Sequence, residues 1–172
     1  MTGPFTFEPL GANHDRTSFS CGVPALDRYL RELATQDIRR RVSNCFVALD
    51  AAGKIAGYYT FAATNLPLTE LRPEQAKRLP RYPSMPACLV GRLAVDQGFR
   101  GRGLGGLLIV DAIARAMRAE PAIFALIVDA KDEVALGFYE HLGFLRFASR
   151  PMTLFLPIAE AARRYGVAAE RP

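Results

Sequence analysis

The stretch RGRGLGG, residues 100–106, lies between an apolar run, CLVGRLAV at 88–95, and a run of helical character, LLIVDAIARAMRAE at 107–120. In a Gly-rich turn ahead of a helix, backbone N–H groups point outward unpaired and the helix N-terminus carries partial positive charge. Glycines also allow an anion to approach the backbone closely. The stretch therefore predicts a phosphate or pyrophosphate site.

Two Gly patterns overlap in this stretch. Gly101, Gly103 and Gly106 form GxGxxG, and a predicted strand further on ends in Asp129, as in a dinucleotide fold. Against that alternative, residues 96–100 separate the preceding strand from the first glycine, and too few strands follow to complete a nucleotide-binding sheet. A P-loop is excluded because no Gly-Lys-Ser/Thr ends the run.

Composition and charge describe the setting of this site. The chain has 172 residues, half of them hydrophobic, and a net charge of +5. We expect one domain over residues 1–172, with a frayed tail from about residue 166, and a bias toward anionic partners. Three scattered cysteines without CxxC spacing favour a reducing compartment and no metal site. The first twenty residues lack the apolar core of a signal peptide, and no apolar run is long enough to span a bilayer.

Hydrophobic periodicity predicts alternating strands and helices. In the first helix, Leu26, Leu30 and Leu33 form an apolar face beside Tyr29. Residues 65–86 are rich in proline and form a loop with a short helix at 72–79. The expected strands are 5–10, 44–50, 55–64, 87–95, 122–130, 144–149 and 152–158, and the expected longer helices are 24–41, 103–120 and 132–143.

The pattern RxxGxG, formed by Arg100, Gly103 and Gly105 after a strand that ends in LAV, resembles the coenzyme A pyrophosphate loop of the GNAT acetyltransferase superfamily. DEVALGFYEHLGF at 132–144 resembles its second signature. The resemblance covers almost the whole chain. It implies an α/β (α+β) GNAT fold with a mixed central sheet of about six to seven strands, flanked by helices and splayed at its centre.

Further segments resemble the GNAT toxins of type II toxin–antitoxin systems, which acetylate the amino group of aminoacyl-tRNA. They include FSCGVPALDRYLRELATQD at 19–37, LPRYPSMPACLVGRLAVD at 79–96 and PMTLFLPI at 151–158. This resemblance implies an acetyl-CoA-dependent N-acetyltransferase of the cytoplasm that blocks translation. It also implies a ribbon-helix-helix antitoxin as partner, and a homodimer is common in this branch.

The resemblance also assigns roles to residues. Tyr139 matches the tyrosine that protonates the departing thiolate, whereas residue type alone favours a packing role for it, like that of Phe138. The main chain of the central strand would pair with pantetheine. Asp132 stands where many members have Asn, so it is left out of the site. The implied acetyl-CoA-binding residues are Leu93, Ala94, Val95, Arg100, Gly101, Arg102, Gly103, Leu104, Gly105 and Gly106.

Basic residues before and within the central strand are candidates for binding tRNA, although most charge runs are only solvated faces. These candidates are Lys77, Arg78, Arg81 and Arg92. No general base emerges: His14 and His141 occupy positions typical of surface or capping histidines. An aminoacyl ester needs little help, because the ester lowers the pKa of its amine below the roughly 7.7 to 8.0 of an ordinary α-amino group.

Two alternatives stay open at this stage. One is a GNAT acetyltransferase for a protein N-terminus or a small-molecule amine. The other is a noncatalytic coenzyme A or dinucleotide-binding module, against which the complete RxxGxG pattern and Tyr139 argue.

Overall fold

The computed structural model of the chain describes residues 4–167, so residues 168–172 of the predicted frayed tail lie outside the described part. Contacts group the chain into two compact units. Unit 1 contains the chain up to Ala62 and Gly91–Asp111, and unit 2 contains Ala63–Val90 and the chain from Ala112 onward. One strand and one helix each continue from one unit into the other. The single domain over residues 1–172 stays a prediction.

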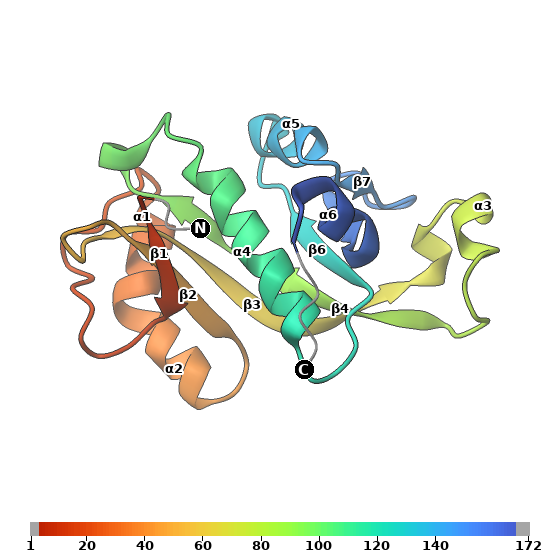
Figure 1. Ribbon diagram of the computed structural model, residues 1–172, viewed down its shortest axis with the longest axis horizontal. Helices are drawn as coiled ribbons and strands as arrows, with labels where there is room; N and C mark the ends of the chain where they lie inside the picture. The colour runs from red at the N-terminus through yellow and green to blue at the C-terminus, as the bar shows by residue number, and fades with distance from the viewer. Residues whose placement is uncertain (1–3, 168–172) are drawn as a thin grey trace. The chain divides into compact units, whose positions relative to one another are not determined.

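Eight strands of the described chain form one mixed sheet in the order β1-β2-β3-β4-β6-β8-β7, and β5 pairs with β3 off this path (Figure 1). The β4–β6 pair is parallel, whereas β1–β2, β2–β3, β3–β5, β6–β8 and β7–β8 are antiparallel. The predicted mixed α/β sheet is confirmed. The strands are β1 (Thr6–Pro9), β2 (Asn44–Leu49), β3 (Ile55–Pro67), β4 (Ser84–Val90), β5 (Leu93–Val95), β6 (Ala125–Asp129), β7 (Leu145–Arg146) and β8 (Thr153–Pro157).

The helices alternate with the strands as the periodicity predicted. None of those described combines the length and apolar character needed to cross a membrane. The α-helices are α1 (Pro24–Arg28), α2 (Ala34–Arg39), α3 (Pro73–Ala76), α4 (Leu104–Arg118), α5 (Glu133–His141) and α6 (Ile158–Tyr165). The π-helical segment is η1 (Tyr29–Leu33), and the 3₁₀ turns are η2 (Leu68–Glu70) and η3 (Gln97–Phe99).

The first predicted helix of unit 1 is interrupted by the π-helical η1. The Ala34 N–H donates to the Tyr29 carbonyl five residues earlier, which inserts one extra residue into the turn. This shift turns Leu33 outward, where it is 37% exposed, and brings Ala34 into the core beside Leu30. The prediction that Leu33 belongs to the buried face was therefore wrong, because a strict α-helical period does not hold through this segment.

Adjacent tyrosines of β3 connect the unit 1 sheet to helices on its two faces, since successive strand residues point in opposite directions. The Tyr58 hydroxyl donates to the Leu26 carbonyl of α1 at 2.7 Å. The Tyr59 hydroxyl donates to the carboxylate of Asp111 on α4 at 2.6 Å. Both rings are fully buried, and both hydroxyls are nevertheless paired.

The predicted strand 87–95 is divided at Gly91–Arg92 into β4 and β5, and this division accounts for the eighth strand. Thr60 of β3 bonds to the break in two ways: its N–H donates to the Arg92 carbonyl, and its Oγ1 accepts the Arg92 N–H, both at 3.0 Å. A side-chain oxygen thus replaces a ladder partner, as is common where a strand bulges. The periodicity did not predict the break because both halves are apolar.

In unit 2, β6 lies between parallel β4 and antiparallel β8. The predicted strand 144–149 is reduced to the two residues of β7. The Phe147 N–H still donates to the Thr153 carbonyl of β8 at 2.8 Å, but the Ala148 N–H donates to the Glu70 carbonyl at 3.0 Å, away from β8. The apolar cluster of this unit contains Leu66, Leu71, Met85, Ala87, Ala125, Ile127, Phe147 and Phe155.

The segment that follows β8 forms α6, and Gly166 ends the helix with φ of 64°. The Arg164 guanidinium donates to the His141 carbonyl at 3.0 Å, and the Tyr165 hydroxyl donates to the Leu142 carbonyl. α6 therefore holds the C-terminal end of α5 in place.

We predict that Thr60→Val lowers the free energy of unfolding by about 1–2 kcal/mol, because the shape is kept while the half-buried Arg92 N–H loses its acceptor. Urea denaturation measures the change. The control is Thr69→Val, at an exposed position of η2, where we expect a change within about 0.5 kcal/mol. Equal stability of the two variants would contradict the role assigned to Thr60.

Candidate active site

In unit 1 the Gly-rich stretch forms an exposed loop that leads into α4. Gly101 and Gly103 have φ of 76° and 72°, a conformation that favours glycine, and a Cβ at either position would meet no atom within 4 Å. The glycines are therefore required by the backbone conformation and leave open space beside the loop. Such a loop at the start of a 15-residue helix is suited to bind a phosphate through backbone N–H groups.

Asp96 fixes the start of this loop, a role the sequence analysis missed. Its side chain is buried, and the residue is only 5% exposed. One carboxylate oxygen accepts the Ser20 N–H and the other accepts the Gly98 N–H, each at 2.9 Å. The spacing Asp-x-Gly after a strand is the local signal for this turn, but no sequence pattern indicates Ser20.

The side chain of Arg100 also joins the loop to the N-terminal part of unit 1. Its guanidinium donates to the Cys21 carbonyl at 2.6 Å. The neighbouring Gly22 has φ of 87°, and a Cβ there would lie 2.8 Å from the Arg100 Nη2. The Arg102 guanidinium lies 5.2 Å from the centre of the Phe99 ring. Arg100 therefore supports the loop through its side chain.

β5 has one edge paired and one edge without a strand among the described residues. In an antiparallel pair, successive residues direct their N–H and C=O groups to opposite edges. Ala94 stands opposite Tyr58. On one side of this pair the Thr60 N–H donates to the Arg92 carbonyl, and on the other the Asp96 N–H donates to the Ala56 carbonyl. Arg92 and Asp96, two residues before and after Ala94, therefore direct these groups toward β3. The main chain of Ala94 therefore faces β3, and that of Leu93 and Val95 faces the open edge.

In unit 2, Tyr139 lies on α5, whose start is fixed by Asp132. The Asp132 carboxylate accepts the Ala135 N–H at 2.8 Å and so acts as the N-cap. This contact gives Asp132 a structural role, in keeping with its omission from the predicted site. The Tyr139 ring packs edge-on against Phe138 and Phe144, with centroids 5.1 and 5.5 Å apart.

The Tyr139 hydroxyl is protonated at neutral pH. Burial, with a smaller contribution from the Asp129 carboxylate, raises the pKa of Tyr139 to about 12. The hydroxyl forms no hydrogen bond within the described residues. Every fully buried polar side-chain atom of these residues does have a hydrogen-bond partner, so the Tyr139 oxygen is not one of the fully buried atoms. The hydroxyl therefore reaches solvent although the ring is buried, and it is available to donate a proton to a ligand.

The three cysteines are free and buried. Burial raises the pKa of Cys45 to about 12 and that of Cys88 to about 11, and it also raises the pKa of Cys21. A nucleophilic cysteine needs a thiolate, so these side chains do not suit an acyl-cysteine mechanism. Within residues 4–167, no group of three or more His, Cys, Asp or Glu side chains is placed to hold a metal ion.

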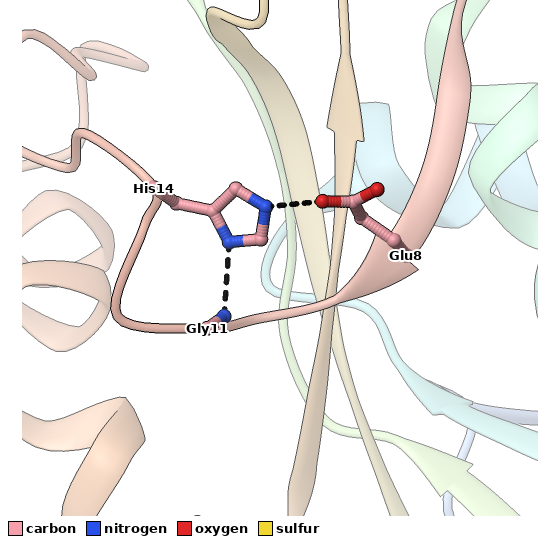
Figure 2. A network of polar contacts seen from close by, with 3 residues as sticks. All are labelled: Glu8, Gly11 and His14. Carbon is pink, nitrogen blue, oxygen red and sulfur yellow. Dashed lines mark hydrogen bonds and ion pairs between the residues drawn. The ribbon is translucent and has the colours of Figure 1, made fainter.

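The side chain of His14 is buried rather than at the surface, and it is 4% exposed. Its Nδ1 accepts the Gly11 N–H at 2.9 Å, and its Nε2 therefore carries the hydrogen and donates to the Glu8 carboxylate at 2.5 Å (Figure 2). Both ring nitrogens are engaged, so His14 holds the loop after β1 and is not available as a base. His141 is exposed in the last turn of α5.

The candidate tRNA-binding residues do not all lie in one unit. Lys77, Arg78 and Arg81 are exposed in unit 2, directly after α3. Arg92 belongs to unit 1, where its guanidinium carbon lies 3.7 Å from the centre of the Tyr29 ring. That ring is buried, and its hydroxyl donates to Asp37 at 2.8 Å. Arg92 is therefore already engaged in a cation–π contact.

Comparison with known proteins identifies the family. The family model described as an acetyltransferase (GNAT) domain matches residues 41–146. The chain belongs to this GNAT acetyltransferase family. It is 35% identical to the tRNA-acetylating toxin of Mycobacterium tuberculosis (strain ATCC 25618 / H37Rv) over 154 residues, which cover 88% of this chain and 91% of the relative.

Solved structures of a toxin are similar over nearly the whole GNAT chain. AtaT complexed with acetyl-methionyl-tRNAfMet has a TM-score of 0.86 and 27% identity, and the match covers 94% of this chain and 99% of that chain. AtaTR bound with acetyl-CoA has a TM-score of 0.79 and 26% identity, with coverage of 94% and 98%. The resemblance to GNAT toxins that was stated from the sequence is thereby confirmed.

We predict that Gly103→Glu weakens acetyl-CoA binding by at least about tenfold, or about 1.4 kcal/mol. The new side chain brings negative charge to the loop and strains a residue with φ of 72°. Calorimetry with acetyl-CoA measures the loss.

Gly53→Glu is the matched control, because Gly53 has φ of 81° and equally open surroundings but lies in the turn between β2 and β3. We expect this variant to bind acetyl-CoA as the wild type does. Unchanged affinity in folded Gly103→Glu would show that the pyrophosphate does not bind at this loop.

Proposed function

We propose that this protein transfers the acetyl group of acetyl-CoA to the α-amino group of an aminoacyl-tRNA and thereby blocks translation. The observation that carries the proposal is the 35% identity to a tRNA-acetylating toxin over 88% of the chain. The likeness to AtaT, solved with acetyl-methionyl-tRNAfMet, supports the same acceptor. The Gly-rich loop of unit 1 and the Tyr139 hydroxyl of unit 2 each support a separate step of this proposal.

Acetyl-CoA, when bound, supplies an acetyl group activated as a thioester. We assign its pyrophosphate to the loop from Arg100 to Gly106, through backbone N–H groups and the start of α4. We assign the pantetheine amides to the main chain of Leu93 and Val95, which can pair with them as a strand adds to a sheet edge. Ala94 was also predicted to bind acetyl-CoA, but its main chain faces β3. We therefore assign it the role of holding β5 against β3.

Tyr139 is the proton donor in this proposal. The acceptor amine forms a bond to the acetyl carbon while the carbon–sulfur bond breaks, and the departing sulfur takes the proton of the Tyr139 hydroxyl. The amine then releases its extra proton to solvent, and the phenolate is reprotonated from solvent. Because the pKa of Tyr139 is raised to about 12, the donor is in its acid form throughout the physiological range.

The acceptor reduces the need for a general base. The amine of an aminoacyl ester has a pKa below the roughly 7.7 to 8.0 of an ordinary α-amino group, so a large fraction is neutral near pH 7. This agrees with the engagement of both His14 ring nitrogens in structural hydrogen bonds. An acceptor of the lysine type would require a base.

The same proposal sets the biological context. We infer a cytoplasmic location, because charged tRNA is used there, and a ribbon-helix-helix antitoxin as the partner that holds the enzyme inactive. We also propose that the two units act together as one GNAT domain over residues 1–172, possible in this topology because β3 and α4 run through both. A homodimer is the oligomeric form we expect.

We predict that Tyr139→Phe keeps the fold and acetyl-CoA affinity but slows acetyl transfer by about 10² to 10⁴-fold, the usual contribution of general acid catalysis. Phenylalanine keeps the packing against Phe138 and Phe144 and removes only the hydroxyl. Single-turnover acetylation of charged tRNA measures the rate. Tyr165→Phe is the control, since its hydroxyl bonds to a backbone carbonyl of the same unit and should leave transfer intact.

The pH profile tests the same residue independently. Because the phenol ionises only near its raised pKa, the wild-type rate should not fall between pH 7 and about pH 10 through loss of this proton. Transfer by Tyr139→Phe at the wild-type rate would rule out the acid role and leave Tyr139 as a packing residue.

We predict that Lys77→Ala, Arg78→Ala and Arg81→Ala weaken tRNA binding and reduce its salt dependence by about one unit of slope for each phosphate that is no longer neutralised. Arg92→Ala should act in the same direction but also disturb Tyr29. Filter binding over a salt series measures the tRNA affinity and its salt dependence. We expect the acetyl-CoA affinity of these variants to be unchanged. The control is Arg31→Ala, an exposed arginine of η1. Unaltered slopes in all four variants would place the tRNA elsewhere.

A further inference from the structure

The segment that joins β3 to β4 in unit 2 carries α3 (Figure 1). Its residues line an open hollow. We call it the α3 hollow and define it by Leu68, Pro73, Leu79, Tyr82, Lys77 and Arg81, which are among its lining residues. Its volume is about 610 Å³, within the range of sites that bind small ligands. No residue assigned to acetyl-CoA or to proton transfer belongs to it.

The hollow is held in place by the core of unit 2. Two of its lining residues, Leu68 and Leu79, pack against the apolar cluster of the unit. The turn that carries Leu68 is fixed by Glu70, whose carboxylate accepts the backbone N–H of Ser149 at 2.9 Å and its hydroxyl at 2.5 Å. The Leu68 N–H also donates to the Pro83 carbonyl at 3.2 Å, which closes the segment. The hollow is therefore formed before any ligand binds.

One side of the hollow is aromatic and its charged groups are all cationic. Tyr82 is 63% exposed, and it lines the hollow beside apolar residues. Lys77 and Arg81 belong to the lining, and no acidic residue does. A ligand that matches this surface has a flat apolar body and negative charge beside it.

We propose that the α3 hollow binds an unpaired nucleotide near the 3′ end of the RNA acceptor, with its base stacked on Tyr82 and its phosphates beside Lys77 and Arg81. This inference rests on the proposed function, because it identifies a contact of the same acceptor. Stacking of a base on an exposed aromatic ring, with cations along the backbone, is the general way in which proteins bind single-stranded nucleic acid.

The shape of the hollow favours a nucleotide over a peptide of an acidic partner. A peptide helix that docks in a groove needs a row of apolar anchors at helical spacing, whereas the α3 hollow is a single depression. An added peptide strand needs a free sheet edge, and the hollow is lined by a proline-rich loop and a short helix. Pro80 and Pro83, the neighbours of Tyr82 in the lining, add apolar surface to the hollow.

The test compares two RNA hairpins that carry no amino acid, one with a single-stranded 3′ overhang and one with a blunt end, in the absence of acetyl-CoA. Fluorescence anisotropy with the full chain measures their affinities. We expect tighter binding of the overhang hairpin by the wild type. Tyr82→Ala should weaken that binding by about 5- to 150-fold, the equivalent of removing one base–aromatic stack of about 1–3 kcal/mol, and leave the blunt hairpin unaffected.

Two further variants make the result specific. Tyr82→Phe keeps the ring and should bind as the wild type does, and Val134→Ala, at a residue 82% exposed on α5, is the control for loss of exposed apolar surface. Because the hairpins carry no amino acid, the outcome of this assay does not depend on acetyl transfer. Equal binding of the overhang hairpin by wild type and Tyr82→Ala would overturn the proposal while acetylation of charged tRNA still stood.

A Glu-rich amphipathic peptide provides the remaining comparison. If this peptide binds in a manner that depends on Tyr82 while the overhang hairpin does not, the hollow is a protein-docking site and the nucleotide proposal is wrong. If the hairpin shows the Tyr82 dependence but wild-type enzyme does not acetylate charged tRNA, the hollow is an RNA site and the proposed reaction is the part that fails.

Discussion

The buried carboxylate of Asp96 determines where the Gly-rich loop of unit 1 begins. It accepts backbone N–H groups from Ser20 and Gly98, and its own N–H donates to the Ala56 carbonyl of β3 at 2.8 Å. Burial of a carboxyl group is costly unless such hydrogen bonds replace its hydration. The loop is therefore tied both to the sheet and to a segment far away in the sequence, so that the exposed glycines beyond it are presented from a fixed base.

In the proposed reaction, some residues hold the backbone of the site and others contact the ligand. Arg100, Asp96 and Thr60 hold the backbone of the loop and of β5, while Leu93, Val95 and the glycines offer main-chain groups to a ligand. In unit 2, burial holds Tyr139 protonated, and α6 fixes the end of its helix. This division explains how few side chains have to act directly in the chemistry: the thioester is already activated, and positioning accounts for much of the rate.

The sequence predicts most of the fold because its signals are local. Hydrophobic periodicity and glycine spacing located the strands and helices, and two motifs identified the family. The features it did not predict depend on long-range or irregular contacts. The π-helical turn at Tyr29 changes the helical period, the break at Arg92 requires Thr60 from a neighbouring strand, and the burial of His14 depends on Glu8 and the fold of a loop. The sequence also did not predict the α3 hollow, since a proline-rich segment indicates only a loop.

The most direct test of the central claim follows the acetyl group itself. Radiolabelled acetyl-CoA is incubated with the wild-type protein and either charged tRNA, the same tRNA without its amino acid, or free amines and N-terminal peptides. The account predicts label on charged tRNA only, in a bond that survives as an N-acetyl amino acid after the ester is hydrolysed. Label on the peptides or amines, with none on charged tRNA, would contradict it and identify a GNAT enzyme with a different acceptor.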